Sequence, residues 1–220
     1  YLGNAMKKLS EKLPSGSGKI YPFTAPKENL NEGFTSSSKV NYVAHCGTFA
    51  GSGYSYTGAL RILKVMLSYD YLWINIRVKG GAYGCMSGIG RSGEGYFVSY
   101  RDPEVKKSDD IYLGIPAYLE NFEADERTMT KYVIGTISEL DTPLTPRAKG
   151  SRSYRSYKTG YTEADMQTER DQVLATDQKK VREAAKMVEA ILSDDKICVL
   201  GGEEKVEEAK ELFDTVRVLN

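Results

Sequence analysis

The chain has 220 residues, of which 40% are hydrophobic and 27% are charged, and this composition is typical of a globular protein with a proper core. Its 30 basic and 30 acidic side chains cancel, which argues against a general binder of nucleic acid or of anionic membranes. No stretch approaches the ~20 apolar residues of a membrane span, and no signal-peptide pattern is present. We therefore expect neither nucleic acid nor membrane as a partner. We expect a cytoplasmic protein, or an organelle-matrix protein if it is eukaryotic.

The N-terminal part of the chain has the pattern of a helix followed by a linker. Apolar residues recur at helical spacing over residues 2–13, and a helix that starts this early indicates a domain taken from a longer protein. Residues 14–37 are rich in Pro, Gly, Ser and Asn, so we expect a long connection with a short strand near 20–23. These features divide the chain into an incoming helix and linker from a preceding domain, 1–37, and a C-terminal domain, 38–220.

The next part of the chain predicts strand, helix and hairpin. Residues 39–49 have the pattern of a strand, a helix follows at about 56–69, and a second short helix is expected at 71–77. In the glycine-rich segment that comes next, an Arg-Ser-Gly-Glu turn separates two strand patterns, at 83–89 and 95–101. This pair predicts a β-hairpin.

The rest of the chain is mostly helical. Capping residues predict helices that begin near Ser108, Asp125, Thr145, Thr162 and either Thr176 or Asp177, the first of them kinked or ended early by Pro116. A buried strand at 196–200, a helix and a last strand at 216–219 complete the order. This order is not the alternation of a doubly wound parallel sheet. It fits the α+β class, with a mostly antiparallel sheet and helices packed on one face.

The cysteines and the histidine exclude several kinds of site. Cys46, Cys85 and Cys198 are far apart and form no CxxC motif, so we expect no disulfide framework and small buried thiols in a reducing compartment. His45 is the only histidine, and a zinc hydrolase normally uses two or three, so we expect no metal site in this chain alone. Because His45 and Cys46 are neighbours in a strand, their side chains point to opposite faces. We therefore expect a packed or hydrogen-bonded His45, and a self-contained cysteine hydrolase is disfavoured.

The segment from Leu72 to Gly84 carries the clearest functional signal. Gly80 and Gly81 can end a helix and turn the chain directly into a strand. Arg77 in the last helical turn and Tyr83 at the start of the strand then point toward the same space. A guanidinium fork and a neutral hydroxyl donor together suit an oxyanion or a peptide carbonyl. On residue types alone, the same pattern also fits a plain helix stop with a surface cation.

The run from Ile76 to Gly84, together with the hairpin ending Ser99-Tyr100-Arg101-Asp102-Pro103, resembles the C-terminal domain of the pitrilysin/insulinase family of zinc metallopeptidases, peptidase family M16, in its presequence protease branch. The resemblance implies a LuxS/MPP-like metallohydrolase fold. It also implies a chamber built from four similar domains, the first of which carries zinc on an inverted His-x-x-Glu-His motif. This chain lacks that motif.

The resemblance further implies a composite active site in which this chain supplies one half. Tyr83 and Arg77 would be its catalytic residues, and Gly80, Gly81, Ala82 and Gly84 would bind substrate. The metal and the base that activates water would belong to an absent domain, so this fragment alone is expected to bind no zinc and to be inactive. The implied partners are an unstructured peptide substrate and the N-terminal domains of the same full-length chain.

Other hypotheses remain open at this stage. One is a non-catalytic module of the same fold that binds peptide or a partner chain, and the upstream reading frame would distinguish it from the enzyme. Another is nucleic-acid binding by basic residues interleaved with tyrosines over 147–161, which a solvated helix face or a chamber wall explains better. The glycines of 47–53 lack the Gly-Lys-Ser/Thr ending of a phosphate-binding loop.

Overall fold

The structure, a computed structural model, describes residues 2–16, 22, 24 and 30–219. Its strands are β1 (Glu32–Ser36), β2 (Asn41–Thr48), β3 (Gly84–Ile89), β4 (Glu94–Asp102), β5 (Lys196–Gly202) and β6 (Thr215–Val218). Its helices are α1 (Leu2–Ser10), α2 (Ala59–Met66), the π-helical η1 (Leu67–Tyr71) and η2 (Trp73–Val78), α3 (Lys106–Leu113), α4 (Ile115–Glu120), α5 (Glu126–Leu140), α6 (Pro146–Thr159), α7 (Glu163–Leu174), α8 (Gln178–Glu183), α9 (Ala185–Leu192), α10 (Glu203–Glu208) and the 3-10 turn η3 (Lys210–Leu212).

The strands form one open sheet in the order β3-β4-β2-β5-β1-β6. The pairs β3–β4, β4–β2 and β2–β5 are antiparallel, whereas β1 is parallel to both of its neighbours. The sheet is therefore mostly antiparallel, and the α+β class expected from the order of elements is confirmed. Strand β3 lies at one edge of this sheet, where one side of its backbone pairs with no other strand of the described residues.

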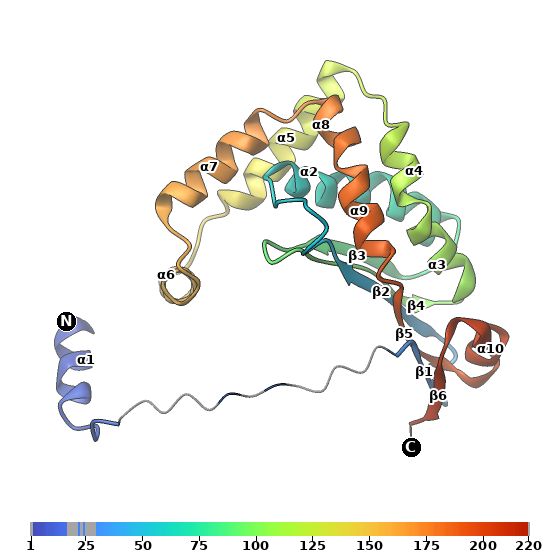
Figure 1. Ribbon diagram of the computed structural model, residues 1–220, viewed down its shortest axis with the longest axis horizontal. Coiled ribbons are helices and arrows are strands. Elements are labelled where there is room, and N and C mark those ends of the chain that lie inside the picture. The colour runs from blue at the N-terminus through green and yellow to red at the C-terminus, as the bar shows by residue number, and fades with distance from the viewer. Residues whose placement is uncertain (1, 17–21, 23, 25–29, 220) are drawn as a thin grey trace.

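One face of the sheet is covered by helices and the other is open (Figure 1). Side chains alternate along each strand, so Val43 and His45 of β2 are buried beneath the helices while Tyr42 and Cys46 are exposed on the opposite face. Helices α2, α4 and α9 supply much of the core, with Leu63, Leu119 and Val188 fully buried. The uncovered face therefore leaves aromatic and thiol groups accessible.

Local capping signals set most helix starts. The side chains of Asp125, Thr145, Thr162 and Asp177 each accept a hydrogen bond from the backbone N–H three residues later, as expected for N-caps. The helix expected from Ser108 begins at Lys106 and is interrupted at Gly114, and Pro116 lies in the first turn of α4. The interruption fits proline's tolerance at helix starts.

Two expectations were wrong. Strand β1 lies within residues 14–37, which we expected to be a connection with a strand only near residues 20–23, most of which lie outside the described residues. Cys46 and Cys198 are exposed rather than buried, because they alternate onto the open face of the sheet. Separately, no helix in the described part of the chain is long and apolar enough to cross a bilayer.

Candidate functional site

The corner between η2 and β3 is built by two glycines. The backbone N–H of Gly81 donates to the carbonyl of Arg77 at 3.0 Å, and that of Ala82 donates to Ile76 at 3.2 Å, which closes the end of the helix. Gly81 has a φ of 83°, in the left-handed region that side chains rarely adopt. A Cβ atom on Gly80 would lie 2.4 Å from the carbonyl oxygen of Ile76. Both positions therefore require glycine, as the sequence indicated.

The structure brings Arg77 and Tyr83 to the same side of this corner. The Arg77 guanidinium carbon lies 4.1 Å from the centroid of the Trp73 ring and 5.8 Å from that of the Tyr83 ring. Arg77 is exposed, and Tyr83 is 58% exposed. Trp73 is one helical turn before Arg77 and stacks on its guanidinium, which limits the conformations of that long side chain. The Arg77 cation and the Tyr83 ring therefore lie side by side at the surface.

The four expected substrate-binding residues are not equally open. Gly80 and Gly81 lie at the corner itself, whereas Ala82 is buried in the core. Gly84 lies beneath the ring of Tyr100, where an added Cβ would come within 2.4 Å of that ring. Only the glycine doublet therefore shares the exposed surface of Arg77 and Tyr83.

Sequence reasoning missed one neighbour of this pair, Arg101 at the end of β4. Its guanidinium carbon lies 5.4 Å from the Tyr83 ring centroid, and the Tyr83 backbone N–H donates to its carbonyl at 3.2 Å. Arg101 is 18 residues after Tyr83 in the chain, and only the pairing of β3 with β4 brings the two together. In the sequence, only the Tyr-Arg-Asp-Pro motif pointed to a role for Arg101 at this site.

His45 is held on both sides, as expected for a hydrogen-bonded core residue. Its Nδ1 lies 2.7 Å from a carboxylate oxygen of Asp109, and its Nε2 lies 3.4 Å from the carbonyl oxygen of Leu192. Burial lowers the pKa of His45, but the hydrogen bond and charge of Asp109 outweigh it and raise the pKa above 6.5. With both ring nitrogens occupied, no nitrogen is left to activate Cys46 or Cys85. The geometry therefore disfavours a cysteine hydrolase.

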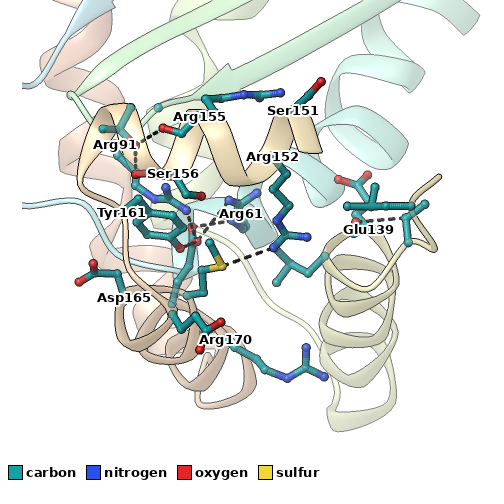
Figure 2. A pocket seen from close by; sticks show the side chains of 18 of the residues that line it. Arg61, Arg91, Glu139, Ser151, Arg152, Arg155, Ser156, Tyr161, Asp165 and Arg170 are labelled. Carbon is teal, nitrogen blue, oxygen red and sulfur yellow. Dashed lines mark hydrogen bonds and ion pairs between the residues drawn. The ribbon is translucent and has the colours of Figure 1, made fainter. Parts of the chain in front are cut away.

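A separate hollow lies between the β3–β4 turn and helices α5, α6 and α7, with a volume of about 1250 Å3. Figure 2 shows Arg91, Arg61 and Tyr161 gathered at one side of it, with Arg152 reaching from α6 toward the sulfur of Met166. Neither Arg77 nor Tyr83 lines this hollow. It is thus separate from the corner site.

Glu169 anchors one wall of the hollow. Its buried carboxylate accepts hydrogen bonds from Tyr56 and Tyr161 at 2.6 Å each, from Arg61 at 2.6 Å and from Arg91 at 2.5 Å. Burial raises the pKa of Glu169, but these four donors lower it to about 2. Sequence reasoning missed this cluster, because its members come from three stretches that are far apart in the chain, at 56–61, 91 and 161–169.

The charged side chains that line the hollow have a net charge of zero. Its six arginines face six carboxylates: Arg61, Arg91, Arg147, Arg152, Arg155 and Arg170 against Glu94, Glu139, Asp141, Glu163, Asp165 and Glu169. The basic run of α6 therefore faces acidic side chains of its own chain, which is the arrangement of a solvated helix pair.

The zinc implied by the resemblance does not fit this chain's own residues. In the described ranges, no three His, Cys, Asp or Glu side chains are grouped so that they could hold a metal ion. The single imidazole is already hydrogen-bonded to Asp109. Cys46 of β2 and Cys198 of β5 lie on the open face of the sheet, opposite to the face that carries His45.

A family model described as the PreP C-terminal domain matches residues 31–202. The chain belongs to this family. The PreP C-terminal domain includes β1 at its start, because the match begins one residue before that strand. The resemblance to the presequence protease branch of family M16 is confirmed, and the chain is a peptidase-related C-terminal domain.

Curated relatives of this PreP C-terminal domain are much longer than the chain. "Protein HypA" of Clostridium perfringens is 45% identical over 197 residues, which cover 90% of this chain and 20% of that protein. "Presequence protease 1, chloroplastic/mitochondrial" of Arabidopsis thaliana is 32% identical over 189 residues, which cover 85% of this chain and 18% of that protein. The chain thus spans about a fifth of the length of these relatives.

A solved structure shares the fold. The crystal structure of a protease from Helicobacter pylori superposes with a TM-score of 0.67 at 14% sequence identity, covering 90% of this chain and 51% of that one. At this identity the likeness shows the fold of the PreP C-terminal domain alone.

Proposed function

We propose that this domain supplies one half of a composite active site in a peptidase that degrades unstructured oligopeptides. The observation that carries the proposal is the exposed pair formed by Arg77 and Tyr83, whose guanidinium carbon and ring centroid lie 5.8 Å apart beside a glycine corner. Membership in the PreP C-terminal domain family gives the pair its peptidase context.

The chemistry of the two groups suits a peptide bond. A phenol is a neutral donor at pH 7, so Tyr83 would donate to the carbonyl oxygen that becomes an oxyanion during hydrolysis. Arg77 would bind the adjacent carbonyl through its fixed N–H donors, and stacking on Trp73 would orient it. Neither group takes the proton of the attacking water, so this half-site would polarise the scissile carbonyl and position the peptide.

The sheet edge next to Tyr83 suits an extended peptide. Strand β3 begins directly after Tyr83 and lies at the edge of the sheet, so one side of its backbone offers hydrogen-bonding groups. An extended peptide added as a further strand would use these groups. Its carbonyls would then pass beside the corner that carries Arg77 and Tyr83.

The other half of the site would come from the N-terminal domains of the full-length protein. Peptidases of family M16 are zinc enzymes, and because no described cluster in this chain suits a metal ion, the metal would belong to those domains. The chain alone would then bind peptide without hydrolysing it.

The decisive experiment replaces the Tyr83 hydroxyl in the full-length protein. Tyr83→Phe should lower kcat about 10²–10³-fold, the usual effect of removing one oxyanion donor, and change KM little. Tyr96→Phe is the matched control, because Tyr96 on β4 is also exposed but its ring lies over Gly88, further along the sheet from the corner. A Tyr83→Phe protein with normal kcat would exclude Tyr83 from the reaction.

A further inference from the structure

Strand β4 carries a β-bulge at Arg101. Asn41 of β2 pairs with Asp102 and Tyr42 pairs with Tyr100, so the intervening Arg101 has no partner on β2. Its φ of 49° lies in the left-handed region, which is uncommon for a residue with a side chain. Bulges of this kind bend a strand and redirect a side chain, and they are frequent beside active sites.

Buried polar contacts fix the backbone on the C-terminal side of the bulge. The Asp102 carboxylate is fully buried and accepts hydrogen bonds from the Glu104 backbone N–H at 2.9 Å and from the Ser108 hydroxyl at 2.7 Å. The Asn41 side-chain amide donates to the Asp102 carbonyl at 2.8 Å. An unusual backbone conformation persists only where its surroundings enforce it, and these contacts do so for Arg101.

The bulge places a second guanidinium beside the aromatic ring of Tyr83. The guanidinium carbons of Arg101 and Arg77 lie 5.4 and 5.8 Å from the centroid of the Tyr83 ring. Both arginines are exposed, and neither forms an ion pair within the part of the chain that the structure describes. Two positive charges without a carboxylate partner therefore lie near the same aromatic ring.

We propose that Arg101 is a third binding residue of this site and that, with Arg77, it binds a carboxylate of the peptide next to the carbonyl held by Tyr83. The inference rests on the proposed function and names its preferred substrates, which are peptides with an acidic side chain or a free C-terminus close to the scissile bond. A single guanidinium suffices for a neutral carbonyl. Two uncompensated guanidiniums favour a full negative charge, because each adds a charge-assisted hydrogen bond.

The test uses the full-length protein and two sets of peptide pairs. In the first set the members of a pair differ only by Glu or Gln at one position, and this position is varied along the residues beside the scissile bond. In the second set they differ only by a free or an amidated C-terminus. Wild type should cleave the acidic member of at least one pair with the higher kcat/KM. Arg101→Asn keeps a residue that tolerates left-handed backbone and removes the charge. It should lower this preference roughly tenfold, mainly through KM, as expected for one charge-assisted bond.

Two further variants separate binding from structure. Arg101→Lys keeps the charge and should retain part of the preference, whereas Arg101→Gly suits the bulge best and should lose the preference while the protein melts no earlier than wild type. Arg155→Asn, an exposed arginine on α6, is the matched control and should keep the wild-type preference.

Several results would overturn the inference. The first is that the wild-type protein cleaves the acidic and neutral members of every pair equally well. The second is that Arg101→Asn loses activity equally on both members of each pair. The third is that Arg101→Gly keeps the wild-type preference for the acidic member. Tyr83→Phe tests the proposed function separately, because it should lower kcat for acidic and neutral peptides alike. A normal Tyr83→Phe protein beside an Arg101→Asn protein without preference would leave the carboxylate site standing and remove Tyr83 from the chemistry.

Discussion

The His45 imidazole and the Asp109 carboxylate meet in the core, with Nδ1 and Oδ1 2.7 Å apart, and join β2 to α3. The other imidazole nitrogen faces the carbonyl oxygen of Leu192, which only accepts hydrogen bonds. An imidazole with protons on both nitrogens therefore satisfies both partners. This explains why the pKa of His45 is raised although burial alone would lower it.

The raised pKa of His45 predicts how the stability of this chain depends on pH. A group whose pKa is higher in the folded state stabilises the fold below its unfolded pKa of 6.5, and this contribution is lost as the pH rises through the folded value. We therefore expect the free energy of unfolding in urea to decrease as the pH rises from 6.5. Asp109→Asn should reduce this decrease, and a variant with the wild-type slope would contradict the assignment.

Glu169 predicts the opposite behaviour in acid. Burial raises its pKa, but donors from Arg61, Tyr161, Tyr56 and Arg91 lower it to about 2, so its stabilisation is present above 4.5 and is lost as the pH falls toward 2. Glu169→Gln should cost about 3 kcal/mol near pH 7, the equivalent of this pKa shift. The same change should flatten the loss of stability between pH 4.5 and 2.

Urea unfolding across that acid range measures both effects of Glu169→Gln. Glu139→Gln is the control, because Glu139 lines the same hollow but forms an exposed ion pair with Lys64, and such pairs contribute about 0–1 kcal/mol. Equal losses in the two variants would show that the Glu169 cluster has no special role.

Features with local causes were predictable from the sequence. The N-caps at Asp125 and Thr162 act within three residues, and the β3–β4 hairpin is closed by a short turn, so a window of the sequence contains the whole signal. The glycine doublet at 80–81 belongs to the same class, because its backbone requirements arise from the adjacent helix end.

Features with distant causes were not predictable. Strand β1 pairs in parallel with β5 and β6, whose residues come more than 150 positions later, and its five residues carry no distinctive alternation. The bulge at Arg101 arises from the register between β4 and β2, and the Glu169 cluster joins segments up to 113 residues apart. These partners are set by the sheet and the helix packing as a whole.

The contact between Tyr100 and Gly84 predicts a steric effect next to the candidate site. The Tyr100 ring covers Gly84 so closely that a Cβ there would lie 2.4 Å from a ring carbon, and the ring also packs edge-on against Tyr83 at 5.6 Å. Gly84→Ala should displace the ring and cost about 1–3 kcal/mol of stability. In the full-length protein it should also lower kcat/KM, because Tyr83 loses a neighbour.

Thermal unfolding and peptide kinetics check this effect. Gly150→Ala is the control, because nothing lies within 4 Å of a Cβ at that helical position and alanine should stabilise the helix by up to about 1 kcal/mol. If Gly84→Ala melts like wild type, the Tyr100 ring moves freely and does not position Tyr83.

Trp73 offers a direct measurement of peptide binding by this chain. It is the only tryptophan, and its ring lies 4.1 Å from the Arg77 guanidinium carbon, so its fluorescence should change when a peptide carbonyl binds Arg77. Titration with an unstructured peptide that lacks tryptophan should give a saturable change. Arg77→Ala should raise the Kd about tenfold through the loss of one charge-assisted hydrogen bond, whereas Arg127→Ala, a change on α5, should leave it unaltered. Among the described arginines, only Arg77 stacks on Trp73. Equal Kd values for wild type and Arg77→Ala would therefore show that the peptide binds away from the corner.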